Sequence, residues 1–119
     1  MSLTSQELAK NAVQILDNKK AEDIMAIKVR DLTIVSDYFV IASGTSTTQV
    51  KALADEVEFQ LEQQGICPQR VEGYQAGEWI ILDYLDVVVH VFYKATREFY
   101  ALERLWADGE QMNLDDMLK

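Results

Sequence analysis

A run of five apolar residues near the middle of the chain limits the fold more than any other feature. Residues 38–42 read Tyr-Phe-Val-Ile-Ala and are entered through Ser36 and Asp37. Aromatic and β-branched residues of this kind favour strands. Because successive strand residues point to opposite faces, a run without polar members is apolar on both faces. Such a strand is typical of the buried centre of a sheet.

The segment after this strand predicts a turn that leads into an amphipathic helix. Residues 43–48 are small and polar, and Ser46 with Gln49 is a candidate capping box. Gly65 in the C′ position and Pro68 shortly after it indicate where the helix ends. Between these signals, apolar residues recur at helical spacing: Val50, Leu53, Ala54, Val57 and Leu61.

The rest of the chain supplies the other elements of an α/β domain. Thr4 and Glu7 form the S/T-x-x-E capping box of a first helix over 5–18. Thr96 is expected to cap a last helix that ends near residues 108–109. The predicted strands are residues 24–29, 38–42, 71–74, 79–82 and 87–93, with the last two forming a hairpin around 83–86. The sum is about three helices and a five-stranded, mixed sheet. Residues 109–119 are expected to be either a short helix or a loose acidic tail.

Length and charge limit the classes of function. A chain of 119 residues is one domain, 1–119. The net charge of −9 repels a phosphate backbone, and Lys19-Lys20 is the only adjacent basic pair, so direct nucleic-acid binding is disfavoured. The sequence shows neither a secretory signal nor an apolar run of about 20 residues, and Cys67 is alone. We expect a cytoplasmic protein, without membrane contact, that attracts basic partners.

Two candidate catalytic features do not carry chemistry. Glu56 and Glu58 have the i, i+2 spacing of the metal-binding carboxylates of nucleotidyltransferases, which lie on a strand. Here they fall in the predicted helix, where two residues correspond to about 200° of rotation, so they cannot share a metal ion. The loop from Ser43 to Ser46 lacks the Walker and G-x-G-x-x-G patterns, so it is interpreted as a turn and helix cap, with a ligand contact as the alternative.

His90 is the only histidine. Ser43 with Asp83 or Asp86 could be nominated around it as a triad, but any sequence supplies such a trio, and no G-x-S-x-G elbow is present. One histidine and one cysteine do not make a zinc site. His90 is therefore expected to be packed or to be a surface contact, and we predict no catalytic residue, no metal and no cofactor.

Aromatic residues are concentrated in the last third of the chain, which is also its more acidic part. Residues 61–119 hold 11 acidic and 5 basic residues. Aromatic side chains are either core material or the anchors of protein interfaces. An apolar patch rimmed with carboxylates could dock on a basic protein. The aromatic residues concerned are Trp79, Tyr84, Tyr93, Phe99, Tyr100 and Trp106.

Four blocks of sequence, in this order and spacing, resemble the ribosomal silencing factor family, which is also called Iojap-like. The blocks are residues 37–46, 78–84, 86–92 and 97–106, and the likeness extends over about residues 5–107. The resemblance implies a nucleotidyltransferase-like core without catalytic residues. It also implies binding to ribosomal protein fourteen of the large subunit, which obstructs joining of the small subunit and lowers translation when nutrients are short. Free members of the family are often homodimers.

By the same resemblance, the hairpin and the last helix are expected to form the ribosomal face. Charge reversal of Asp83 or Glu103 should then weaken the complex. The family usually has glycine where this chain has Leu85, so either the turn is of another type or Leu85 is an exposed apolar tip. The alternative functions are a large-subunit assembly factor and an active nucleotidyltransferase. The candidate contact residues are Trp79, Asp83, His90, Tyr100, Glu103 and Trp106.

Overall fold

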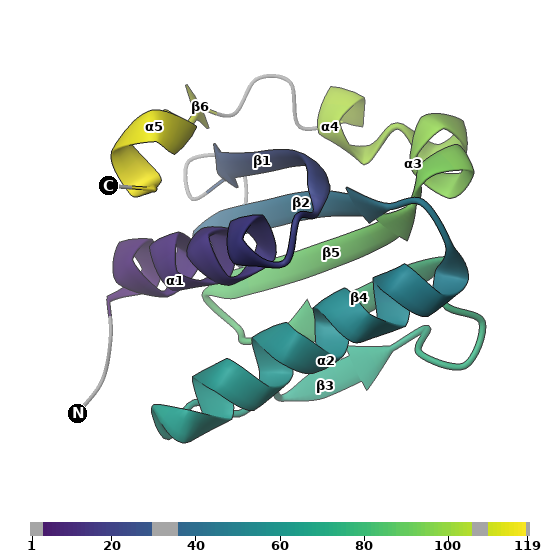
Figure 1. Cartoon of the computed structure of the whole chain (residues 1–119). Coiled ribbons are helices and arrows are strands. Elements are labelled where there is room, and N and C mark those ends of the chain that lie inside the picture. The colour runs from purple at the N-terminus through teal and green to yellow at the C-terminus, as the bar shows by residue number, and fades with distance from the viewer. Residues whose placement is uncertain (1–3, 30–35, 106–109, 119) are drawn as a thin grey trace.

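The computed structural model describes residues 4–29, 36–105 and 110–118 as a mixed α/β domain (Figure 1). The helices are α1 (Ser5–Asn18), α2 (Thr47–Gln63), α3 (Lys94–Tyr100), α4 (Leu102–Leu105) and α5 (Leu114–Met117). The strands are β1 (Glu22–Lys28), β2 (Tyr38–Gly44), β3 (Arg70–Glu72), β4 (Trp79–Asp83), β5 (Val87–Tyr93) and β6 (Glu110–Gln111).

The six strands form one sheet in the order β3-β4-β5-β2-β1-β6. Strands β2 and β5 are parallel, and the other neighbours are antiparallel, so the predicted mixed sheet is confirmed. The predicted central strand is also confirmed, because β2 lies between β5 and β1, and Val40, Ile41 and Ala42 are fully buried. The sheet has six strands instead of five, since β6 contributes two residues, which are too few for a sequence pattern.

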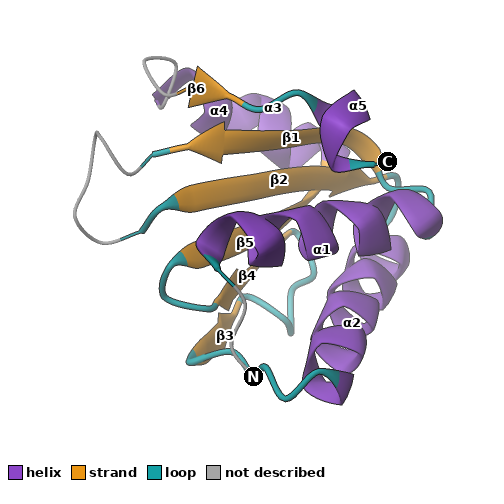
Figure 2. Cartoon of the chain, turned by 90° about the vertical axis from the view of Figure 1, so that its left-hand side faces the viewer, coloured by secondary structure: helices purple, strands orange, loops and turns teal. Residues whose placement is uncertain are grey.

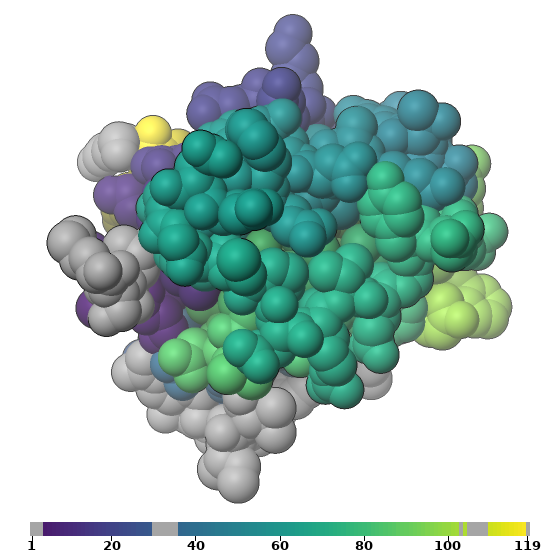
Figure 3. Space-filling view, turned by 90° about the horizontal axis from the view of Figure 1, so that it is seen from below, coloured from purple at the N-terminus to yellow at the C-terminus, as the bar shows by residue number. Residues whose placement is uncertain are grey.

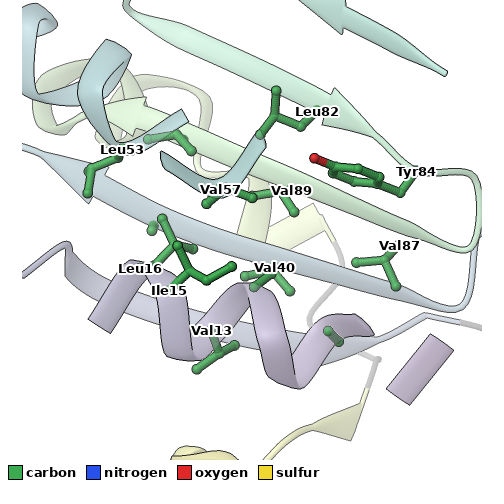
Figure 4. Packing of buried hydrophobic residues seen from close by; sticks show 14 of the residues in the cluster. Val13, Ile15, Leu16, Val40, Leu53, Val57, Leu82, Tyr84, Val87 and Val89 are labelled. Carbon is green, nitrogen blue, oxygen red and sulfur yellow. The ribbon is translucent and has the colours of Figure 1, made fainter. Parts of the chain in front are cut away.

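Helices α1 and α2 cover one face of the sheet and form the main core with it (Figures 2 and 4). The capping box of α1 is confirmed: the Glu7 amide donates to Thr4 Oγ1, and the Thr4 amide donates to Glu7 Oε1. At α2 the Gln49 amide donates to Ser46 Oγ, so Ser46 is the N-cap. Figure 4 shows side chains of both helices meeting those of the strands, among them Leu16, Val40, Val57 and Val89.

The described residues cover the second face of the sheet only in part. Its smaller core cluster contains Ile27, Ile41, Phe92 and Leu102, with Trp79 packed against it. Leu102 is the contribution of α4, which lies with α3 on the side of the sheet opposite α1 and α2 (Figure 2). Within residues 4–29, 36–105 and 110–118, the sheet therefore has one complete helical layer and one incomplete layer.

The sequence predicted one last helix capped by Thr96, and this prediction is wrong in where the helix begins and in its being unbroken. Helix α3 begins at Lys94, directly after β5, so Thr96 lies inside the helix and does not cap it. Ala101 adopts a left-handed conformation with φ of 46° and separates α3 from α4. This break changes the helical phase, so that Phe99 is 80% exposed while Leu102 is buried. Residues 106–109, where the helix was expected to end, lie outside the described residues.

Residues 110–118 form β6 and α5, so the short helix is the alternative that the structure shows. Strand β6 pairs with β1, and Asn113 caps α5 through a hydrogen bond from the Asp116 amide. The buried Met117 side chain joins the main core, and its carbonyl accepts a hydrogen bond from Gln14 of α1. Within the residues described, none of the helices combines the length and apolar character that crossing a bilayer requires.

The hairpin turn between β4 and β5 keeps a backbone conformation that favours glycine. Leu85 has φ of 72°, and its side chain is 56% exposed, so it is an apolar tip on a strained position. Asp83 Oδ1 accepts a hydrogen bond from the Leu85 amide, and the Leu85 carbonyl accepts one from Ser36 Oγ. These two bonds hold the turn in place.

Leu85→Gly should therefore stabilise the protein, by about 1 kcal/mol, because glycine adopts positive φ without a steric penalty. Urea denaturation at neutral pH measures the change. Leu85→Ala is the matched control, since it removes the exposed side chain but keeps the strained backbone, and it should leave stability nearly unchanged. Equal stability of the glycine and alanine variants would contradict the strain at this turn.

Candidate partner-binding face

Aromatic side chains gather on the incompletely covered face of the sheet, where β4 and β5 meet α3. The Trp79 ring of β4 stacks on Phe92 of β5 with ring centres 4.9 Å apart. The ring of Tyr100, the last residue of α3, is tilted against that of Trp79, with ring centres 5.0 Å apart. Phe99 packs edge-on to Tyr100 at 5.1 Å. We call Trp79, Phe92, Phe99 and Tyr100 the aromatic cluster.

The aromatic cluster is accessible at its α3 end. Phe99 is 80% exposed and Tyr100 is 51% exposed, whereas Trp79 is half-buried and Phe92 is buried. A cavity of about 370 Å³ lies beside the two α3 rings and is also lined by Glu78. Large rings that are held by neighbouring rings and are also exposed have the character of interface anchors, because they lose little freedom when a partner covers them.

His90 lies beneath Trp79 and fixes its orientation. It is only 6% exposed, and its Nδ1 accepts a hydrogen bond of 3.1 Å from the Trp79 indole N–H. This bond requires a neutral imidazole that carries its proton on Nε2. Burial lowers the pKa of His90 to about 4, and the Asp83 charge opposes this shift only in part. His90 is therefore a neutral packing residue at physiological pH.

Asp83 lies on the same face as Trp79, at the far end of β4. The two side chains are four strand residues apart, or about 13 Å. Asp83 Oδ2 forms an ion pair of 3.3 Å with Arg70 of β3, while Oδ1 holds the hairpin turn. Glu78 at one end of β4 and Asp86 at the other are exposed. The aromatic cluster thus has carboxylates at both ends of the strand that carries it.

The structure brings four of the six predicted contact residues to one side of the molecule. Trp79 and Asp83 are on β4, His90 is on β5 and Tyr100 ends α3. Glu103 belongs to α4, but its side chain and the whole of Trp106 lie outside the described residues. Of the other aromatic residues that the sequence left open, Tyr84 is core, since it is 7% exposed, and Tyr93 is half-buried.

One member of this surface was missed by the sequence analysis, and the exposure of another was left open there. Phe99 was named as either core material or an interface anchor, and the structure, in which the left-handed Ala101 follows α3, leaves it 80% exposed. Phe39 of β2 is half-buried and packs edge-on to His90 at 4.9 Å. It was assigned to the core because β2 is apolar on both faces. Burial of a β2 side chain depends on how far α3 and α4 extend over the sheet, which the sequence pattern does not reveal.

The features that were discounted as catalytic have structural roles here. Glu56 accepts a hydrogen bond from Gln60 and pairs with Lys19, so its carboxylate is directed away from any position shared with Glu58. Ser43 is buried, and its Oγ accepts a hydrogen bond of 2.8 Å from Arg97. In the described ranges, no group of three or more histidine, cysteine or acidic residues could hold a metal ion.

The fold and this face together define a class: a small mixed α/β domain whose half-open sheet presents an aromatic cluster with acidic neighbours. Comparison of the sequence with known families gives a full-length match. Residues 2–119 match the family described as ribosomal silencing factor during starvation, and the chain belongs to that family.

Individual relatives agree with this assignment. The ribosomal silencing factor RsfS of Halalkalibacterium halodurans is 40% identical over 116 residues, covering 98% of this chain and 99% of that protein. A crystal structure of a protein from Chromobacterium violaceum superposes with a TM-score of 0.86 at 37% identity, covering 93% of this chain and 92% of that one. A mouse protein named for mitochondrial assembly of the ribosomal large subunit is 35% identical over 97 residues, covering 79% of this chain and 42% of that protein.

Proposed function

We propose that this protein binds ribosomal protein fourteen of the large subunit and sterically blocks joining of the small subunit, thereby repressing translation when nutrients are limited. The observation that carries the proposal is the exposed end of the aromatic cluster, Phe99 and Tyr100, next to the acidic side chains around β4. Membership in the silencing factor family supports a ribosomal partner. In this proposal the protein acts in the cytoplasm, where the subunits join.

The chemistry of the face suits a basic protein partner. Aromatic anchors supply contact area that excludes water, and carboxylates at the rim attract basic side chains and set the orientation of approach. The net charge of −9 opposes close contact with ribosomal RNA. Docking should thus be confined to a protein surface on the large subunit.

The proposed mechanism is occupancy of space and makes or breaks no bond. The domain measures 33 × 32 × 27 Å, so it covers a substantial area of the subunit surface on which it sits. Subunits that approach this surface are excluded as long as the protein stays bound. In this proposal the protein is not an enzyme and requires no cofactor.

Light scattering from purified small and large subunits tests the block directly. Rejoining in the presence of magnesium raises the scattering, and saturating protein should suppress this rise. Full rejoining at concentrations that saturate the large subunit would overturn the silencing mechanism.

That same outcome would favour the second candidate, an assembly factor for the large subunit. The name of the mouse relative is the observation that supports this candidate. An assembly factor would bind large-subunit precursors better than mature subunits. Robust nucleotide turnover with Mg²⁺ would instead support a nucleotidyltransferase. Such an enzyme needs a pair of carboxylates at i, i+2 on a strand, and the described strands carry no such pair, since Glu56 and Glu58 lie in helix α2.

The family resemblance further suggests that the free protein is a homodimer. Sedimentation equilibrium should then give twice the 13.6 kDa of one chain. A monomer mass at all accessible concentrations would contradict this.

Asp83→Asn should weaken binding to large subunits about threefold, because it removes a rim charge. We choose asparagine rather than a charge-reversing lysine because the asparagine oxygen can still accept the hydrogen bond from the Leu85 amide. Lysine would lose this bond and with it the support of the turn. Co-sedimentation with large subunits measures the loss, and the difference from wild type should shrink at high salt. An effect that is independent of salt would indicate a structural role for Asp83.

A further inference from the structure

Helix α3 carries the two exposed rings of the aromatic cluster, but it buries no apolar stripe of its own. It is seven residues long, all of them described, and Arg97 is the one buried residue among them. A short helix in a protein is usually held by an apolar face that packs on the core. The position of α3 on the sheet therefore depends on the polar contacts of Arg97 and on the contact between Tyr100 and Trp79.

Arg97 connects α3 to two strands of the sheet. It is 7% exposed, and its Nη1 donates hydrogen bonds to Ser43 Oγ at 2.8 Å and to the Asp23 carbonyl at 2.5 Å. Ser43 lies near the end of β2, over which α3 packs (Figure 1), and it pairs with Phe92 of β5. Alternation along β2 places the Ser43 side chain on the same face as Ile41 of the smaller core cluster. The guanidinium group is thus fixed beside the aromatic cluster.

A bulge in β1 supplies the second acceptor. The register of β1 against β2 shifts between Glu22 and Met25, so that β1 contains one extra residue here. Asp23 lies in this bulge with φ of 49°, which is uncommon for a residue other than glycine. Bulges interrupt regular pairing and are frequent next to active sites, and strained residues persist where their surroundings hold them. The bulge therefore leaves the Asp23 carbonyl available to Arg97.

The spacing along α3 links these bonds to the exposed rings. Tyr100 follows Arg97 by three residues, so the two side chains are neighbours on one side of the helix. Rotation of α3 about its axis would break the bonds of Arg97 and would also move the Tyr100 ring away from Trp79. Phe99 precedes Tyr100 by one residue, or about 100° around the helix, and is 80% exposed. One rotational setting of α3 thus determines the placement of both rings.

We propose that Arg97 is the positioning residue of the partner-binding face. It holds α3 in the orientation in which Tyr100 contacts Trp79 and Phe99 projects toward the partner. Both anchors are then in place before binding, which lowers the entropic cost of association. This inference rests on the proposed function, because Arg97 influences ribosome binding only if the aromatic cluster is the contact surface.

Arg97→Met tests the inference, because methionine is long enough to occupy much of the same space but donates no hydrogen bond. Affinity for large subunits, measured by co-sedimentation where urea denaturation shows the variant to be folded, should fall tenfold or more. Arg97→Lys keeps the charge and can donate to one of the two oxygens, so it should recover part of this loss. In the free protein, the nuclear Overhauser cross-peaks between the Tyr100 and Trp79 rings should disappear in Arg97→Met.

The cross-peaks distinguish positioning from a merely structural role. If Arg97 only stabilised the fold, the variant would unfold at lower urea, but its folded molecules would keep the Tyr100–Trp79 contact and the affinity. Retention of the cross-peaks in folded Arg97→Met would therefore overturn the proposal. Should Arg97→Met fail to fold, Ser43→Ala removes one acceptor without changing a charge. It should weaken the cross-peaks and lower the affinity about threefold, and no change in either would refute the positioning role.

Lys94→Gln is the matched control. It removes one positive charge from the same helix, as Arg97→Met does, but Lys94 is exposed, and its printed contact is a weak ion pair of 3.9 Å with Glu22. The cross-peaks and the affinity should both be unchanged. If Lys94→Gln loses as much affinity as Arg97→Met, the charge of α3 matters and its orientation does not.

The results also separate this inference from the proposed function. If replacement of both Phe99 and Tyr100 weakens binding and folded Arg97→Met does not, the proposed face is correct and the positioning role is refuted. If the wild-type protein does not bind large subunits, the proposed function fails, and the cross-peaks in the free protein still determine whether Arg97 orients α3.

Discussion

Replacement of both Phe99 and Tyr100 by alanine is expected to weaken binding to the large subunit a hundredfold or more. Exposed aromatic anchors at protein interfaces contribute about 2 kcal/mol each, and about 3 kcal/mol together suffices for a hundredfold loss. Both rings project from the end of α3 and are 80% and 51% exposed, so their removal leaves the main core intact. Co-sedimentation with purified large subunits measures the loss.

The chain itself offers a matched control for this double variant. Phe59 on α2 and Tyr74 between β3 and β4 are also one phenylalanine and one tyrosine, 58% and 40% exposed. Figure 3 shows that α2 and the segment from β3 to β4 lie side by side on the face of the domain seen from below. Phe59→Ala with Tyr74→Ala should leave ribosome binding unchanged. If the control pair loses as much affinity as the α3 pair, the proposed face is in the wrong place.

The second large effect concerns stability against acid. The pKa of His90 is lowered by burial from 6.5 to about 4. Between these two values the unfolded chain binds a proton at His90 that the folded chain does not, so stability falls as the pH falls through this window. His90 should account for a loss of about 2 kcal/mol in the free energy of unfolding between pH 7.5 and pH 5. Below pH 4 both states are protonated and its contribution stays constant.

His90→Asn tests this effect, because asparagine does not titrate and can offer an oxygen to the Trp79 indole N–H near the place of Nδ1. The variant should be less stable than wild type at neutral pH, and its stability should depend less on pH between 7.5 and 5. Urea denaturation at a series of pH values gives both curves. Parallel curves for wild type and variant would show that His90 is not the group responsible. Should the variant fail to fold, direct NMR titration of the imidazole in the wild type still tests the lowered pKa.

The pH prediction also has a consequence for the partner-binding face. Protonation of His90 at Nδ1 would remove the acceptor of the Trp79 N–H and place a charge beneath the aromatic cluster. At physiological pH this is avoided, so the cluster is held in one arrangement before a partner arrives. Preorganised anchors bind with a smaller loss of entropy than mobile ones.

The sequence was sufficient for features that depend on local chemistry or strict periodicity. The Thr4–Glu7 capping box, the α2 stripe and the central position of β2 were all predicted and are present. These features each have several residues that point to the same element. The sequence was insufficient where a single backbone angle decides where a helix ends. At Ala101 the backbone is left-handed, and an alanine does not indicate this conformation.

The candidate site shows the same division. The resemblance directed attention to the hairpin and the last helix, and the structure places Trp79 and Asp83 on β4, His90 on β5 and Tyr100 on α3. The bonding of His90 and the exposure of Phe99 could not be predicted, because both depend on the incomplete second layer. A one-dimensional pattern shows which residues are apolar but not where a covering helix stops.

The register of the sheet has a consequence for the order in which the protein acquires its structure. Tyr38 of β2 pairs with Val87 of β5, and Ile27 of β1 pairs with Gln111 of β6. Pairings between such distant segments favour slow folding, since a long loop must close before its contacts compensate the lost entropy. During synthesis at about 5–20 residues per second, the centre of the sheet must wait for the second half of the chain. Until then the apolar strand β2 lacks one neighbour, and a nascent chain of this protein depends on its completed C-terminal half to bury it.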